Sequence, residues 1–345
     1  MRQDRIIWVD VMRGFSMLLV VLGHVLMVMG IEDHDTVLSR LLVSFRMPLF
    51  FFVSGYFSYR SLTWWTKSRV KDILNRKLKA QILCTIVFLS TFQYINRGYV
   101  DLFAGFGGYW FTIVLFQMYL LYLISNLLSR YIRRDIVIPV LIIISIIGIG
   151  IFARKPVNIW IWDFLVWSKL ANYMQFFTLG IICSKYNSKF FALLSTNKFK
   201  TIVIIGWIIT MLLWHSNFLK ETFPLFFTVN FNLTVRYFGL LCVIMIFFSH
   251  ASTLSRNNRF CLILRFIGRR TLDIYMIHFF FLPNLKFLYS YVIDDFVLQL
   301  IISGFFTIII SGLCLIVSQI LRQSNTLSIW LFGERKQQKE LAQAL

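Results

Sequence analysis

Apolar stretches of about 20 residues recur from one end of the chain to the other, and this repetition constrains the fold more than any other feature. A helix needs about 20 apolar residues to cross the hydrocarbon core of a bilayer. We therefore expect an all-α integral membrane protein, a bundle of about ten transmembrane helices. The expected spans are residues 6–29, 37–56, 80–94, 108–128, 136–153, 170–183, 201–214, 235–248, 272–289 and 296–321.

Charged residues are too scarce for a water-soluble protein. They make up 14% of the 345 residues, against about 25% in soluble domains, whereas 58% are hydrophobic. The first stretch contains Asp10, Arg13 and His24, and no small-residue cleavage site follows it. It is therefore expected to remain as a helix and not to be removed as a signal peptide.

The net charge of +20 would suggest a nucleic-acid partner in a soluble protein. Here most Lys and Arg residues fall in alternate loops and near the two ends, as the positive-inside rule describes. Both termini are thus predicted to be cytoplasmic. The dense basic run at residues 60–79 is expected to face anionic lipid headgroups. Membrane lipids are the expected partners, and nucleic acid is not.

The sequence indicates a single domain. Residues 1–333 are expected to form a single transmembrane domain, and residues 334–345 a cytoplasmic tail. The five cysteines are scattered, with no spacing typical of a disulfide framework or a metal site, so no metal is expected.

Three ionisable side chains lie in the first stretch, where a charge is costly and indicates either function or a buried pair. Arg13 and His24 are 11 residues apart, almost a whole number of helical turns. They share one face and lie about 16 Å apart along the axis, and Asp10 lies within about 60° of that face. The alternative is that Asp10 and Arg13 neutralise each other and that His24 is a hydrogen-bonded interior residue.

Two other stretches hold polar groups at membrane depth. Arg46 lies just before Pro48, which is expected to kink its helix and to free backbone carbonyls. Arg46 either binds an anion or polarises an oxygen, or those carbonyls satisfy it. The ninth stretch contains Asp273, Tyr275 and His278, which form part of a site or a packing cluster.

Four short strings resemble signatures of the membrane acyltransferase-3 family, in the family's order. Ten residues separate Arg13 from His24, as in the family's motif of Arg, ten residues and His. The string FRMPLFFFVSGYF is similar to the second-helix signature, and GYWF at 108–111 resembles the aromatic start of the fourth helix. TLDIYMIH at 271–278 resembles the late segment, usually Ser/Thr-x-x-Ile-Tyr-Leu-x-His. The matches extend from residue 10 to about residue 280.

The resemblance implies transfer of an acyl group, usually acetyl from cytoplasmic acetyl-CoA, to a carbohydrate on or across the bacterial inner membrane. The family's catalytic histidine corresponds to His24, and the arginine that helps to hold the donor corresponds to Arg13, with Asp10 in the same motif. The second string is similar to that of the fucose 4-O-acetylase-like branch. The resemblance also implies that three further residues line the substrate or oxyanion site: Arg46, Tyr275 and His278.

The chain departs from the family in one respect. Many members also carry a periplasmic hydrolase-like domain that completes transfer, and no residues here are left over to form one. Either this chain acetylates its acceptor directly, or it passes the acetyl group to a separate periplasmic transferase.

The chemistry of these residues agrees with the implied roles. An imidazole exchanges protons near neutral pH, so it accepts a proton from an attacking hydroxyl, and arginine binds phosphate oxygens well. We expect acetyl-CoA to enter from the basic face as a substrate, with no tightly bound cofactor, while Arg46 stabilises the oxyanion. The acceptor, a carbohydrate or lipid-linked sugar, would bind at the outer loops. A transporter or flippase for a lipid-linked sugar remains the alternative.

Overall fold

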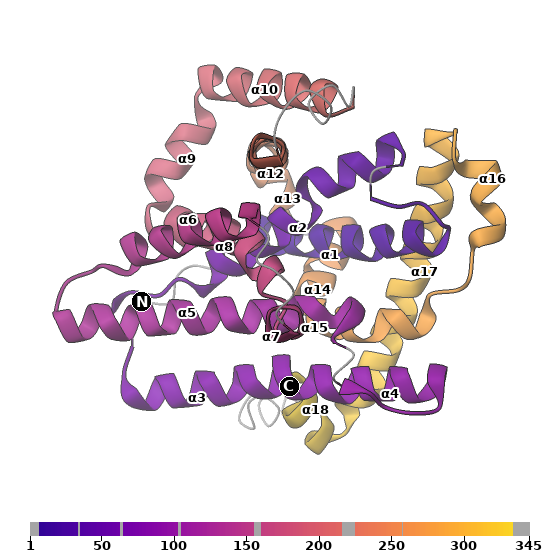
Figure 1. Ribbon diagram of the computed structural model, residues 1–345, viewed down its shortest axis with the longest axis horizontal. Coiled ribbons are helices and arrows are strands. Elements are labelled where there is room, and N and C mark those ends of the chain that lie inside the picture. The colour runs from indigo at the N-terminus through magenta and orange to yellow at the C-terminus, as the bar shows by residue number, and fades with distance from the viewer. Residues whose placement is uncertain are drawn as a thin grey trace.

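A computed structural model describes residues 7–333, except 34, 63–64, 103–104, 155–159, 216–224 and 257. Its described elements are all helices, which confirms the predicted all-α class (Figure 1). Seven helical segments among these residues are long and apolar enough to cross a membrane. They are Ile7–Val28, Val37–Ser58, Ser68–Arg97, Gly107–Ile132, Asn197–Trp214, Phe231–Ser249 and Phe296–Gln323.

These seven segments agree with seven of the ten predicted spans. They lie in α1 (Ile7–Val28), α2 (Val37–Ser58), α3 (Lys67–Lys77) with η2 (Leu78–Leu83) and α4 (Cys84–Arg97), η4 (Gly107–Tyr109) with α5 (Trp110–Ile132), α10 (Asn197–His215), α12 (Leu225–Ser249) and α17 (Phe296–Gln323). The other three predicted spans correspond to α6 (Val137–Arg154), α8 (Trp167–Lys185) and α15 (Thr271–Ile277) with η5 (His278–Phe281). The count of ten and the cytoplasmic termini stay predictions, and the tail at 334–345 lies outside the described residues.

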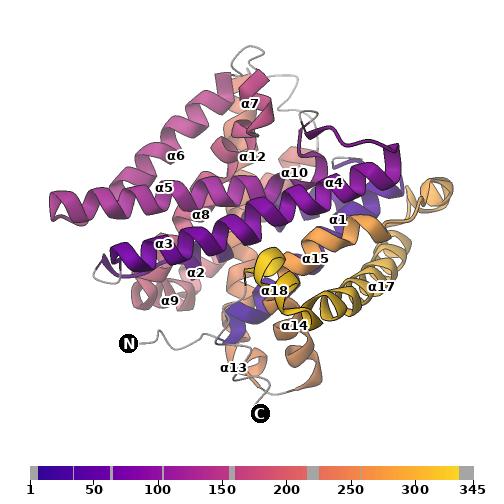
Figure 2. The same cartoon turned by 90° about the horizontal axis from the view of Figure 1, so that it is seen from below.

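Shorter helices connect the long ones. They are η4 (Gly107–Tyr109), α7 (Trp160–Phe164), α9 (Asn187–Ser195), α13 (Ala251–Leu254), α14 (Arg259–Arg269), η6 (Lys286–Leu288), α16 (Tyr289–Val292) and α18 (Asn325–Phe332). The last of these packs on η2 and lies between the α3–α4 rod and α17 (Figure 2).

The predicted ninth span, 272–289, is wrong in length, because its helix ends at Phe281. Pro283 follows two residues later and lacks the N–H that would continue a helix. The residue before a proline is also driven out of the helical region, and Leu282 is extended with φ −73° and ψ 110°. The chain then turns back, and the Leu285 amide donates to the Val28 carbonyl at the end of α1 (3.2 Å).

Glycines let the central helices approach closely, as small residues do in membrane bundles. A Cβ added at Gly14 of α1 would lie 2.0 Å from the Leu264 carbonyl oxygen of α14. At Gly180 of α8 it would lie 2.1 Å from the Phe52 carbonyl oxygen of α2. Helix α1 therefore packs against α14, and α2 against α8, backbone to backbone.

Pro48 lies inside α2, which continues without a break from Val37 to Ser58. Proline leaves the carbonyl four residues earlier, that of Ser44, without its usual donor. Gly239 of α12 packs over this position, and a Cβ there would lie 3.1 Å from the Ser44 oxygen. The close contact between α12 and α2 thus covers the backbone that Pro48 disrupts.

Candidate active site

Two histidines from opposite ends of the sequence meet inside the helical bundle. His24 comes from α1, and His278 comes from the point where α15 tightens into η5. Their ring centroids are 4.9 Å apart, and Nε2 of His278 lies 3.3 Å from Nδ1 of His24. His278 is fully buried and His24 is partly exposed. The pair therefore has one ring held in the interior and one that is open to a reactant.

Hydrogen bonds to backbone carbonyls fix which ring nitrogens carry hydrogen. Nδ1 of His278 lies 3.1 Å and 2.8 Å from the carbonyl oxygens of Ile274 and Tyr275, and Nδ1 of His24 lies 2.9 Å from that of Val20. A carbonyl oxygen can only accept, so each Nδ1 is a donor. In the neutral rings, Nε2 of His278 accepts from His24. Nε2 of His24 then keeps its lone pair and is the basic atom of the pair.

Arg46 lies beside the two histidines, and the sequence predicts it at the same membrane depth as His24. Its guanidinium packs on Gly23, where an added Cβ would lie 1.2 Å from NH1 of Arg46. The side chain is 14% exposed and forms a 3.4 Å ion pair with Asp33, which is 62% exposed. A guanidinium next to His24 is placed to stabilise negative charge on a reacting oxygen.

Tyr275 links two of the family-like strings, TLDIYMIH and GYWF, by hydrogen bonds. Its hydroxyl donates to the Gly108 carbonyl (2.6 Å) and accepts from the Phe111 amide (3.2 Å). That amide belongs to the first turn of α5, where N–H groups have no partner within the helix. The Tyr275 ring also lies 5.8 Å from the ring of His278. Tyr275 thus anchors the start of α5 next to the histidine pair.

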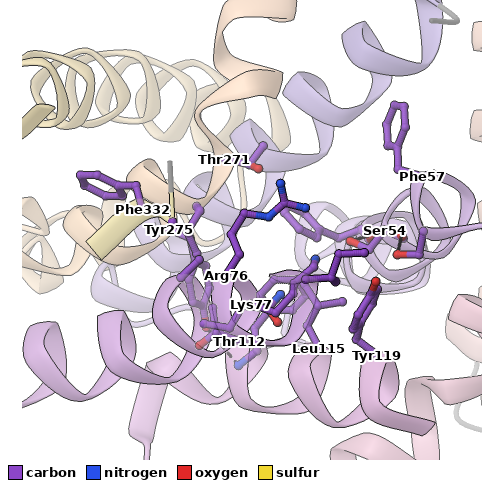
Figure 3. Close-up of a pocket in the computed structure, with 18 of the residues that line it drawn as sticks. Ser54, Phe57, Arg76, Lys77, Thr112, Leu115, Tyr119, Thr271, Tyr275 and Phe332 are labelled. Atoms are coloured by element: carbon purple, nitrogen blue, oxygen red, sulfur yellow. Dashed lines mark hydrogen bonds between the residues drawn. The ribbon is translucent and has the colours of Figure 1, made fainter. Parts of the chain in front are cut away.

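Tyr275 also lines a cavity of about 530 Å³ (Figure 3). Its walls come from α1, α2, α3, η2, α5, α15 and the end of α18. Its volume is within the range of about 300–1,000 Å³ for small-molecule sites. The described residues of the lining include no Asp or Glu, and their basic side chains are Arg13, Arg60, Arg76 and Lys77. The cavity is therefore suited to a ligand that carries several negative charges.

Sequence reasoning missed three of these basic residues. Arg60, Arg76 and Lys77 belong to the run at 60–79 that was expected to face lipid headgroups. Lys77 instead lies with Nζ 4.8 Å from the centre of the Tyr119 ring of α5, and Arg76 extends towards the space below Thr271 (Figure 3). The spacing of Arg76 and Lys77 with Ala80 and Gln81 along one helical face was the signal in the sequence.

The structure separates the predicted site residues into two places. Arg13 lines the cavity, where its guanidinium lies 5.9 Å from the centre of the Phe57 ring. Asp10 is buried, and its carbonyl contacts Gly268 of α14; it does not line the cavity. His24, His278 and Arg46 lie beyond Tyr275, which borders both places.

Asp273 has a structural environment. It is 1% exposed, accepts two hydrogen bonds from Arg322 (2.7 Å and 2.8 Å) and one from Ser318, and lies 3.6 Å from Arg270. These contacts join α15 to α17 and hold the helix that carries Tyr275 and His278. Within the described part of the chain, no group of three His, Cys, Asp or Glu residues is arranged to hold a metal.

A second polar cluster in the bundle was also missed. Arg236 of α12 donates to Asn172 of α8 (3.1 Å) and lies 5.6 Å from the centre of the Tyr173 ring. Its Nε is buried without a hydrogen-bond partner among the described groups, and no described carboxylate pairs with it. An arginine within the predicted span 235–248 was visible in the sequence and indicates function or a buried partner.

The fold and site define a multi-pass membrane protein that holds a histidine pair beside a basic cavity. A family model, Acyl_transf_3 (acyltransferase domain), matches residues 6–316. The chain therefore belongs to the acyltransferase-3 family, which confirms the resemblance of its four strings, and it is a membrane acyltransferase. No curated protein and no solved structure matches the chain significantly.

Proposed function

We propose that this protein is an O-acetyltransferase that moves an acetyl group from acetyl-CoA to a hydroxyl of a cell-surface carbohydrate or of its lipid-linked precursor. The observation that carries the proposal is the juxtaposition of the histidine pair and the basic cavity, with Tyr275 between them. The family match favours this reaction class over a flippase.

The cavity suits the nucleotide end of CoA. Its phosphate groups would bind Arg13, Arg60, Arg76 and Lys77, because guanidinium and ammonium groups neutralise phosphate. The arm that carries the thioester would extend towards Tyr275 and the histidines. Arg13 and His24 lie on one continuous helix, so about 16 Å along its axis separates the phosphate end from the base.

In the proposed reaction, the acceptor hydroxyl attacks the thioester carbonyl while Nε2 of His24 takes its proton. The new C–O bond forms and the carbonyl oxygen becomes negative, next to the guanidinium of Arg46. The C–S bond then breaks, and the imidazolium of His24 returns the proton to the sulfur of CoA. His278 does not contact the reactants; it holds the Nδ1 hydrogen of His24 and so fixes the ring.

A carbohydrate acceptor agrees with the polar and aromatic groups in the bundle. The rings of Trp110 and Tyr173 are stacked at 5.8 Å, and Arg236 lies next to Tyr173. Flat rings beside hydrogen-bonding groups suit a sugar, which has both apolar faces and hydroxyls. We place the protein in the bacterial inner membrane, where it delivers the acetyl group directly or through a separate periplasmic transferase.

The test is transfer of labelled acetyl from acetyl-CoA to membrane carbohydrate by wild-type protein and by His24→Ala. Label is expected with the wild type and not with the variant. His250→Ala is the matched control, because His250 also bonds the carbonyl four residues earlier but is exposed. Folded wild-type protein that transfers no label, with acceptor-bearing membranes present, would overturn the proposal in favour of the flippase.

A further inference from the structure

Gln81 is a buried polar residue in the wall of the basic cavity. It lies in η2, the π-helical turn between α3 and α4, and is 5% exposed. Its side-chain oxygen, Oε1, is buried and has no hydrogen-bond partner among the residues that the structure describes. A buried acceptor without a donor is unfavourable, so such an atom in a ligand cavity indicates a donor on the ligand.

The position of Gln81 defines which part of a ligand it would contact. The α3–α4 rod and α5 run in opposite directions: Lys77 lies against Tyr119, and Thr85 hydrogen bonds Thr112 (2.6 Å). Gln81 is one turn from each of Lys77 and Thr85 along the rod. It therefore lies between the basic side chains and the wall that Thr112 and Tyr275 form.

Acetyl-CoA carries N–H donors in that part of its length. The arm between the phosphates and the thioester contains two secondary amides, each with one N–H group. Acetyl phosphate and the acyl chains of a phospholipid have no such donor. Oε1 of Gln81, about one helical turn beyond Lys77, is thus suited to accept a hydrogen bond from the amide-containing arm of a thioester substrate.

We propose that Gln81 accepts a hydrogen bond from an arm amide of acetyl-CoA and so selects a pantetheine-bearing donor. This rests on the proposed function, because it requires CoA in the basic cavity. Gln81 acts on donor binding, whereas His24 acts on the transfer step. Replacing Gln81 therefore raises the KM for acetyl-CoA with little change in kcat.

The experiment compares two probes on purified full-length protein, CoA and 3′-phospho-ADP, which is the nucleotide part of CoA without the arm. Gln81→Leu is expected to weaken CoA binding about tenfold, because the amide N–H loses its partner in a desolvated site. Binding of 3′-phospho-ADP is expected to stay within about twofold of the wild type. Gln81→Glu keeps an acceptor oxygen and is expected to retain more CoA affinity than Gln81→Leu.

Gln93→Leu is the matched control, because Gln93 is also buried on the same rod but bonds the backbone of Asp101 with both amide atoms. It is expected to change neither affinity. The proposal is overturned if Gln81→Leu leaves CoA binding unchanged, as water in the cavity would predict, or if it weakens both probes equally. It is also overturned if the Leu and Glu variants lose equal affinity. Wild-type protein that binds neither probe would instead refute the proposed donor itself.

Discussion

Nε2 of His278 lies 3.3 Å from Nδ1 of His24, although 254 positions separate the two residues in the chain. The carbonyls of Ile274 and Tyr275 hold the far side of the His278 ring, so the ring that accepts from His24 is itself fixed. The two histidines therefore form one unit, in which the interior ring and the Val20 carbonyl both accept the Nδ1 hydrogen of the exposed ring. A base oriented by a second group is a recurring arrangement in acyl transfer.

Removing the second ring tests this unit. His278→Ala is expected to lower kcat by about tenfold to a hundredfold, because His24 keeps only the Val20 carbonyl to orient its ring and loses its second acceptor. The KM for acetyl-CoA is expected to stay unchanged, since His278 does not line the cavity. Steady-state kinetics with varied acetyl-CoA measure both. An unchanged kcat, or a loss that appears only in KM, would contradict the role of His278.

The packing of Arg46 on Gly23 gives a second prediction. Gly23→Ala places a methyl group where the Arg46 guanidinium lies, so Arg46 must move away from His24. Activity is expected to fall at least about tenfold, because losing one oxyanion donor costs about a hundredfold to a thousandfold. Gly312→Ala of α17 is the control, since no atom of the described residues lies within 4 Å of the added methyl. Equal activity of the two variants would show that Arg46 is not needed at this position.

The basic cavity predicts how charge affects donor binding. Arg76→Gln and Lys77→Gln are each expected to weaken CoA about tenfold or more, and raised salt to weaken wild-type binding. Lys71→Gln is the matched control, because Lys71 lies on the same helix but is exposed and does not line the cavity. Equilibrium binding at two salt concentrations checks the prediction. If all three variants lose the same affinity for CoA, the net charge of the protein, and not the basic side chains of the cavity, accounts for binding, and the prediction is wrong.

The buried carboxylate of Asp273 predicts a loss of stability. Asp273→Asn breaks the ion pair with Arg322, which is 12% exposed, and is expected to cost about 3–5 kcal/mol. Thermal unfolding in detergent measures the change. Asp135→Asn breaks the pair of Asp135 with Lys185, in which Asp135 is 45% exposed, and is expected to cost less than about 1 kcal/mol. Similar unfolding temperatures for the two variants would refute a structural role for Asp273.

The sequence alone determined the all-α class of the fold, and it singled out His24 and His278 as ionisable groups within predicted membrane spans. Long apolar stretches form helices wherever they lie, since a backbone in a membrane must satisfy its own hydrogen bonds. Arg13 and His24 share a helical face because 11 residues separate them, which is a local relation. The end of the ninth helix was misplaced, although Pro283 was a local signal for it.

The tertiary structure decided which groups meet. His278 reaches His24, and Tyr275 reaches Gly108, because α15 packs against α1 and beside the start of α5. The packing of η2 against α5 and α18 turns part of the basic run at 60–79 inward, so Arg76 and Lys77 line a cavity where lipid contact was expected. The helical face that Gln81 shares with Lys77 can be read from the sequence, but the burial of that face in a cavity cannot. Contacts within a cavity depend on which helix faces pack against one another. The hydrophobic periodicity of a sequence predicts which face of each helix is buried, but it does not predict which other helix packs against that face.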